Sequence, residues 1–176
     1  MRRPLLVAAV VTGLLAVTFV VILGARLFRE DPALGINDAS LAQAKRNTEI
    51  TDSARDLTLA FLAVDYRDMD ARVAAVLKLA TGTFKSQYET AKKNLSAAAV
   101  QSKAVSTGEI KYVGLSKVTS RSATALVAAD STVSNTLITE AKDKGQPVDE
   151  TRYYRFQLRL DLVKGSWLVS DLQFVG

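Results

Sequence analysis

The first feature of the chain is an unbroken apolar run near its N-terminus. The 19 residues from Leu5 to Leu23 carry no charge and are almost all hydrophobic. As an α-helix rising about 1.5 Å per residue, the run is roughly 28 Å long, close to the ~30 Å hydrocarbon thickness of a bilayer. The pattern predicts one membrane-spanning helix, which with its flanks forms an anchor over residues 1–27.

The flanks of this run bear on its orientation. Arg2 and Arg3 precede it and Arg26 and Arg29 follow it, so the arginine count is equal on the two sides. A first apolar segment behind a short basic leader usually inserts with its N-terminus in the cytoplasm. We therefore expect a single-pass protein of the inner (cytoplasmic) membrane with an extracytoplasmic, periplasmic C-terminal domain. A cleaved signal peptide is the alternative, although its apolar core would be about 7–15 residues, shorter than this run.

Small residues gather on one face of the predicted anchor. A spacing of three or four residues between small side chains lets two membrane helices approach closely and pack. The run contains no Asp, Glu, Lys or His, so nothing in it suggests a proton relay or an ion path. The candidate helix-packing interface consists of Ala9, Thr12, Gly13 and Ala16.

Beyond a predicted linker over residues 28–40, apolar residues recur at intervals of three and four. This period is typical of amphipathic helices that bury one face. Ser40 and Gln43 form a capping-box pattern at the start of the first helix. Three helices are predicted, at 41–66, 69–79 and 84–102, with inward stripes of Ile50, Ala54, Leu57, Phe61 and Val64, of Met69, Val73, Val76 and Leu77, and of Phe84, Tyr88, Ala91, Leu95 and Ala98.

From residue 105 onward the apolar period changes to two, which is typical of strands with one buried face. The clearest example is 151–163, where Tyr154, Phe156 and Leu158 alternate with Arg155 and Gln157. The polar segment 133–150 is predicted to be an extended hairpin tip or a loop. The predicted strands are 105–115, 122–132, 151–163 and 166–175.

The first of these strands contains two glycines. On simple alternation, Ile110 and Tyr112 share one of its faces, and Val113 and Leu115 share the other. Its glycines, Gly108 and Gly114, suggest a bulge or a bend.

Three amphipathic helices followed by four antiparallel strands predict an α+β fold in which the helices cover one face of the sheet. Residues 41–176 are enough for one domain with its own core. If the sheet curls, as a bulge would allow, the domain becomes a cone. The candidates to line an apolar pocket inside this cone are Phe61, Tyr112, Tyr154, Phe156 and Trp167.

Composition removes several functional classes. The net charge is +5, of which Arg2 and Arg3 supply two, and no cluster of Lys and Arg with interleaved aromatic residues indicates nucleic-acid binding. The chain has no Cys and no His. It therefore lacks a thiolate nucleophile, a thiolate zinc site and the commonest general base. We expect no cofactor, no metal and no catalytic residues.

Two short motifs suggest a family. Residues 81–84 read Thr-Gly-Thr-Phe and are followed by Tyr88, and residues 164–169 read Lys-Gly-Ser-Trp-Leu-Val near the C-terminus. With the anchor and the segment 61–66, they make the chain resemble the actinobacterial Mce-associated membrane proteins. The outer domain of that family is similar to the NTF2-like (SnoaL-like) cone.

The resemblance implies an accessory subunit beside an Mce-type ABC importer of lipids, fatty acids or sterols. The implied partners are the permease and Mce subunits, contacted through the membrane helix and the outer domain, with lipid contact also expected. The family supplies no catalytic residues.

Other interpretations stay open. The cone could bind an apolar ligand directly, or the chain could be an assembly component of another envelope machine, since VirB8-like secretion subunits also place an NTF2-like domain behind one anchor. Some NTF2-like cones are isomerases that use an Asp base and a Tyr donor. No spacing here singles out such a pair among Asp65, Tyr66, Tyr88, Asp130 and Asp161.

Overall fold

A computed structural model describes residues 37–175, so the predicted anchor and most of the predicted linker lie outside the described residues. None of the helices in this part of the chain is long and apolar enough to cross a bilayer. The helices are α2 (Asp38–Leu62), α3 (Met69–Leu79), α4 (Gly82–Ser102) and α5 (Thr136–Asp143), and the strands are β1 (Val64–Asp65), β2 (Val105–Ser116), β3 (Ser122–Ser134), β4 (Thr151–Val163) and β5 (Ser166–Phe174).

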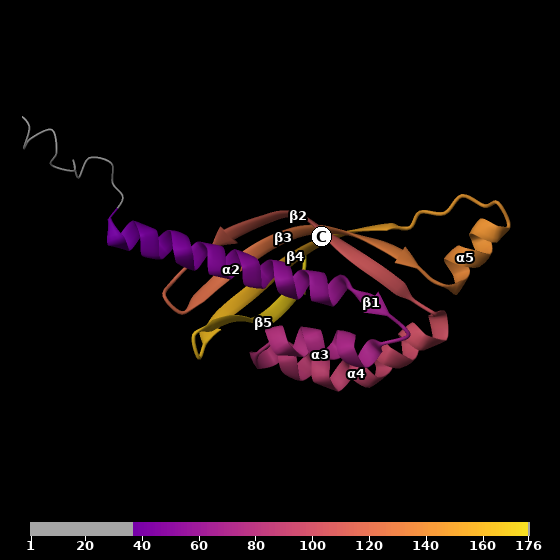
Figure 1. Ribbon diagram of the computed structural model, residues 1–176, viewed down its shortest axis with the longest axis horizontal. Coiled ribbons are helices and arrows are strands. Elements are labelled where there is room, and N and C mark those ends of the chain that lie inside the picture. The colour runs from indigo at the N-terminus through magenta and orange to yellow at the C-terminus, as the bar shows by residue number, and fades with distance from the viewer. Residues whose placement is uncertain (1–36, 176) are drawn as a thin grey trace, which may run out of the picture. The chain divides into compact units, whose positions relative to one another are not determined.

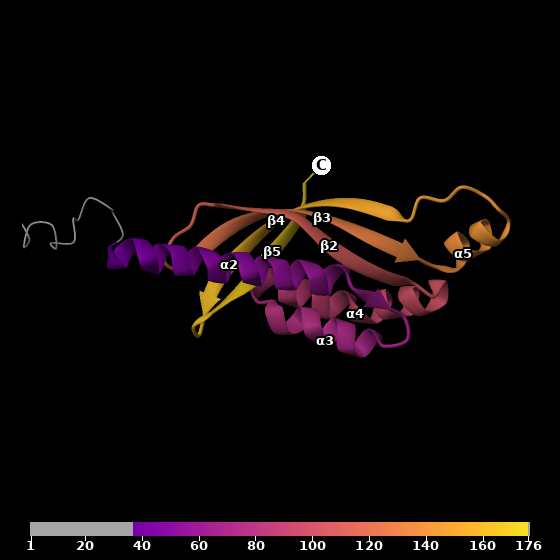
Figure 2. The same ribbon diagram turned by 45° about the horizontal axis from the view of Figure 1, so that its top comes forward.

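The five strands form one antiparallel sheet in the order β1-β2-β3-β4-β5, so each strand pairs with its neighbour along the chain. The sheet curves, and α2 runs along its inner side with α3 and α4 beside it (Figures 1 and 2). The predicted α+β class is confirmed, as are the bounds of α3 and β4. The sheet has one strand more than predicted, because Val64 and Asp65 pair with the start of β2.

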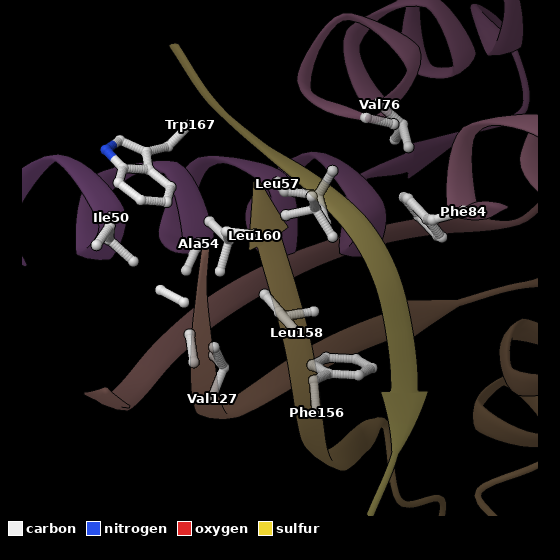
Figure 3. Packing of buried hydrophobic residues seen from close by; sticks show 14 of the residues in the cluster. Ile50, Ala54, Leu57, Val76, Phe84, Val127, Phe156, Leu158, Leu160 and Trp167 are labelled. Atoms are coloured by element: carbon white, nitrogen blue, oxygen red, sulfur yellow. The ribbon is translucent and has the colours of Figure 1, made fainter. Parts of the chain in front are cut away.

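The core lies between α2 and the inner face of the sheet. Ile50, Ala54 and Leu57 on α2 have no exposed surface, and neither do Leu158 and Leu160 on β4. Figure 3 shows these side chains facing one another across the interface. Both hydrophobic clusters of the domain draw all their residues from the compact unit 43–176. This part of the chain therefore carries its own core.

Asn37 caps the N-terminus of α2. Its side-chain oxygen accepts a hydrogen bond from the backbone N–H of Ser40 at 2.8 Å, as an N-cap residue does. The predicted Ser40–Gln43 capping box is wrong, because the helix begins earlier and Ser40 lies inside its first turn. The Gln43 amide instead donates to Asn47 and accepts from Arg46.

The C-terminus of α2 falls four residues before the predicted one. The Ser106 hydroxyl donates to the carbonyl oxygen of Leu62 at 2.6 Å and accepts from the backbone N–H of Val64 at 3.3 Å. These bonds satisfy backbone groups that the end of a helix leaves free. The chain then turns into β1, so Val64 pairs with a strand instead of continuing the helical stripe.

A bulge in β2 changes the predicted faces of that strand. The register with β3 shifts between Ile110 and Tyr112, which leaves Lys111 as the extra residue. Ile110, Val113 and Leu115 therefore all pack against the core, whereas Tyr112 is 66% exposed. The predicted grouping of Ile110 with Tyr112 is wrong, and the bulge lies between the two glycines and not at either of them.

A short helix occupies part of the predicted hairpin tip. The side chain of Asn135 caps it by accepting from the backbone N–H of Ile138 at 2.9 Å, and Ile138 is buried. The Thr136 hydroxyl donates to the carbonyl oxygen of Ser102 at the end of α4. The segment between β3 and β4 is therefore neither a simple tip nor an unstructured loop.

The approach of α2 to β2 gives a first testable prediction. A Cβ at Gly108 would lie 2.8 Å from the Cβ of Leu62, a contact that the backbone of α2 or β2 must move to relieve. We expect Gly108→Ala to lower the free energy of unfolding by about 1–3 kcal/mol in urea denaturation.

The matched control is Gly114→Ala in the same strand. Its Cβ would meet the ring of the exposed Tyr112 at 3.1 Å, and that side chain can turn away. We expect a change within about 0.5 kcal/mol. Equal losses for the two variants would show that the contact between Leu62 and Gly108 is not tight.

Candidate functional site: an aromatic cluster that reaches the surface

Six aromatic rings from four elements meet at one end of the core. α2 contributes one ring, α4 two, β4 two and β5 one. The curvature of the sheet brings the last strand back towards the helices, so residues far apart in sequence become neighbours. We call this group the aromatic cluster: Phe61, Phe84, Tyr88, Tyr154, Phe156 and Phe174.

Phe61 is the central ring of the cluster. Its centroid lies 6.2 Å from those of Phe84 and Tyr88, 5.9 Å from that of Phe156 and 6.5 Å from that of Phe174. The contact with Phe156 is edge-to-face, the geometry that the ring quadrupoles favour. Phe61 therefore joins the rings of α4 to those of the sheet.

The rings of the sheet form the second half of the cluster. Tyr154 stacks on Phe156 with centroids 5.5 Å apart and an interplanar angle of 8°. Phe174 lies edge-on to Phe156 at 5.2 Å and tilted against Tyr154 at 6.3 Å. The end of β5 is thus held by aromatic contacts as well as by its pairing with β4.

Exposure rises steadily across the cluster. Phe156 is 1% exposed and Phe84 6%, whereas Phe174 is 65% exposed. Phe61, Tyr88 and Tyr154 are half-buried. Exposed aromatic surface that continues a buried cluster is typical of places where an apolar ligand or a partner side chain binds.

The aromatic cluster contains no ionised side chain. Its hydroxyl groups belong to Tyr88 and Tyr154, and burial raises the pKa of Tyr88 above its ordinary value. The Tyr88 phenol therefore stays neutral at physiological pH. No carboxylate belongs to the cluster, so it supplies no acid–base pair.

The structure brings together three of the five predicted pocket residues. Phe61, Tyr154 and Phe156 lie in the aromatic cluster. Tyr112 is on the outer face of the sheet, 66% exposed, because of the β2 bulge. Trp167 is buried near Ile50, and its carbonyl oxygen accepts from the Ser53 hydroxyl at 2.5 Å (Figure 3).

Phe84, Tyr88 and Phe174 were missing from the predicted pocket. Phe84 and Tyr88 stand in the apolar stripe of the predicted helix 84–102 and Phe174 lies in the predicted strand 166–175, so their places in regular elements were visible in the sequence. Their meeting with Phe61 was not, because it depends on how the sheet curves. The predicted helix-packing interface (Ala9, Thr12, Gly13 and Ala16) lies outside the described residues.

The polar residues considered for catalysis have structural partners. Arg67 donates two side-chain hydrogen bonds to Asp65, at 2.7 and 2.6 Å, and these bonds lower the pKa of Asp65 to about 2. The Arg67 guanidinium also lies 5.8 Å from the centroid of the Tyr66 ring. Asp65, the last residue of β1, is thus ionised at neutral pH and is not a base poised near it.

The remaining two acids are paired on the sheet. Asp130 lies 3.6 Å from the ammonium group of Lys111, and Asp161 lies 3.6 Å from the guanidinium of Arg159. Within residues 37–175, no group of three or more acidic or other ligating side chains could hold a metal ion.

The two motifs noted in the sequence contact each other in the structure. The backbone N–H of Thr81 donates to the carbonyl oxygen of Val169 at 2.8 Å. Gly82 has φ +54°, and a Cβ there would lie 3.2 Å from the Cβ of Ser170. Phe84, at the end of the first motif, enters the aromatic cluster. These motifs therefore attach the start of α4 to β5.

The fold is similar to that of several proteins of known structure, two of which are described as type IV secretion system proteins. An IcmL-like protein from Legionella pneumophila is 11% identical, with a TM-score of 0.55 over 80% of this chain and 93% of that one. CagV from Helicobacter pylori, described as a VirB8 homolog, is 14% identical, with a TM-score of 0.53 over 72% and 96%. The periplasmic domain of DotI is 12% identical, with a TM-score of 0.53 over 72% and 92%. At these identities the likeness shows the fold alone, an α+β fold with one curved antiparallel sheet.

The sequence also defines a family. Residues 7–176 match the profile described as "Uncharacterized protein Rv1363c/MT1408-like", and the chain belongs to that family. No curated protein sequence matches the chain significantly.

The gradient of burial in the aromatic cluster gives a second testable prediction. Phe61→Ala removes the central ring and its contacts with four others. We expect it to lower the free energy of unfolding by about 3 kcal/mol in urea denaturation. Phe174→Ala removes a largely exposed ring, and we expect a loss below about 1 kcal/mol. A larger loss for Phe174 than for Phe61 would contradict the assignment of Phe174 as surface.

Proposed function

We propose that the chain is a non-catalytic component of a multi-subunit complex in the cell envelope, in which the extracytoplasmic domain contacts other subunits. The observation that carries the proposal is the aromatic cluster, which ends in the exposed ring of Phe174 and contains no ionised group. Exposed aromatic side chains are typical anchors of protein interfaces.

The structural likenesses support this class of function. Two of the proteins of similar fold, the IcmL-like protein and CagV, are described as type IV secretion system proteins, and the DotI structure is described as a periplasmic domain. A membrane-anchored, outward-facing subunit of an envelope machine would combine such a domain with the predicted anchor at 1–27. The type of machine does not follow from the fold, because one fold serves many functions.

The sequence resemblance indicates one particular complex. It implies an Mce-type lipid importer, with the permease and Mce subunits as partners and the chain as a stabilising or regulatory subunit. The motifs that carry the resemblance serve to join α4 to β5. These motifs therefore explain how the fold is stabilised and say less about which partner the chain binds. The Mce importer is accordingly the more specific part of the proposal.

Purification of the full-length chain from its native membranes tests the proposal. A tagged protein extracted in mild detergent is expected to co-purify with a defined set of envelope subunits, measured by quantitative mass spectrometry. Phe174→Ser is expected to reduce that recovery by about tenfold, because it removes an exposed aromatic anchor. Gly13→Leu should also reduce it if the anchor packs on a membrane helix.

The control is Tyr153→Ser. Tyr153 is 69% exposed, comparable with Phe174 at 65%, but belongs to the opposite face of the sheet. Recovery of Mce and permease subunits supports the finer proposal, and recovery of secretion-type subunits supports the alternative. A tagged chain that purifies alone, or an equal loss for Phe174→Ser and Tyr153→Ser, contradicts the role of the aromatic cluster.

A further inference from the structure

α4 has an apolar stripe that the domain does not cover. Over its 21 residues, Phe84 and Ala99 are the buried side chains. The sequence predicts an inward stripe through Leu95 and Ala98, yet Leu95 is 42% exposed and Ala98 is exposed. Val100 is 54% exposed. The second half of α4 thus exposes Leu95 and Val100, which no other part of the described chain covers.

The same helical layer carries the positive charge of the domain. Residues 69–103, which contain α3 and α4, have six Lys and Arg against two Asp and Glu, a net charge of +4. The other described residues have 13 Lys and Arg against 14 Asp and Glu. The basic residues of this layer are Arg72, Lys78, Lys85, Lys92, Lys93 and Lys103.

These six cations form no ion pair among the described residues, although the charge of Arg72 helps to lower the pKa of Asp65. Within residues 37–175, every ion pair involves other Lys and Arg residues. Elsewhere in the domain, Lys111, Lys142 and Arg159 each pair with an acid. Basic residues in α3 and α4 therefore outnumber the acidic ones and also lack ion-pair partners in the described chain, which creates a positive field over the two helices.

A groove of about 530 Å³ runs between the two helices. Its lining includes Val73, Ala74 and Leu77 of α3, which are apolar. Lys92, Lys93 and Ser96 line it from α4, and Asp70 is its one acidic residue. The lysine stems can lie along apolar surface while their ammonium groups reach outward.

We propose that the α3–α4 layer binds the anionic headgroups of a lipid bilayer. Lysines near an anionic bilayer surface are attracted to its phosphate groups, and exposed apolar side chains beside them can enter the headgroup boundary. Lysine acts as a point charge and suits headgroups without fixed geometry, whereas a built site for one carboxylate would favour arginine. The inference does not depend on which complex the chain joins.

The predicted anchor makes such contact practicable. Fourteen residues separate Leu23 from the start of α2 at Asp38. At up to about 3.3–3.6 Å per residue they span at most roughly 50 Å, so the domain would stay near the bilayer surface. Two exposed large apolar residues, Leu95 and Val100, give little insertion, so attraction to anionic lipid would dominate and would weaken with salt.

Vesicle binding by residues 37–176 tests the proposal, since that segment contains the whole core. The measurement is flotation with vesicles of phosphatidylcholine containing about one-third phosphatidylglycerol, against pure phosphatidylcholine. The double variant Lys92→Glu with Lys93→Glu is expected to bind at least about tenfold more weakly, because each lysine near an anionic surface contributes about fivefold. Binding of the unaltered domain should fall as salt rises.

The charge-matched control is Lys117→Glu with Lys164→Glu. Both residues lie in exposed turns with positive φ, outside the helical layer, and the change in net charge is the same. This variant should keep most of the binding, and circular dichroism should show both variants folded. Equal binding to the two vesicle types, equal loss for the two double variants, or no binding at low salt would each overturn the proposal. The last result would leave an acidic protein as the partner of this surface.

Discussion

The packing of α2 on the inner face of the sheet is the contact on which the rest of the domain depends. Ile50, Ala54 and Leu57 are wholly buried against β3, β4 and β5, so α2 and the sheet each cover the apolar face that the other would expose. Ser106 ends the helix where β1 must begin, and Phe61 in its last turns organises the aromatic cluster. One helix therefore closes the core, starts the sheet and places the candidate site.

The residues that stabilise the fold differ from the residues that are available to bind a partner. The motifs that carry the family resemblance join α4 to β5, and the candidate catalytic acids Asp65, Asp130 and Asp161, all on the sheet, are paired with basic side chains. Two surfaces have no evident role in stabilising the domain: the exposed end of the aromatic cluster and the basic α3–α4 layer. These two surfaces have different chemistry, one apolar and uncharged, the other cationic, and so suit different partners.

The regular elements followed from the sequence because local pattern determines them. α3 and β4 have the predicted bounds, since a strict period of 3.6 or 2 continues to each end. The early end of α2 and the position of the β2 bulge were not predictable, because they depend on long-range contacts of Ser106 and on the register with β3. α5 was missed because its eight residues lie within the polar segment 133–150, which has the composition of a hairpin tip or a loop.

The candidate site was predictable only in part, for a related reason. Phe61, Tyr154 and Phe156 were placed together from their faces alone, but Tyr112 left the group when the bulge turned it outward. The stripe of α4 shows the limit of periodicity: the pattern predicts an apolar face, but not whether the domain itself or something outside covers that face.

The most direct test of the account is hydrogen–deuterium exchange of the full-length chain in its native membrane complex, compared with the isolated domain. The account predicts slower exchange at the end of β5 and along the second half of α4, with α2 and the centre of β4 unchanged. Identical exchange at both surfaces in the two states would contradict it.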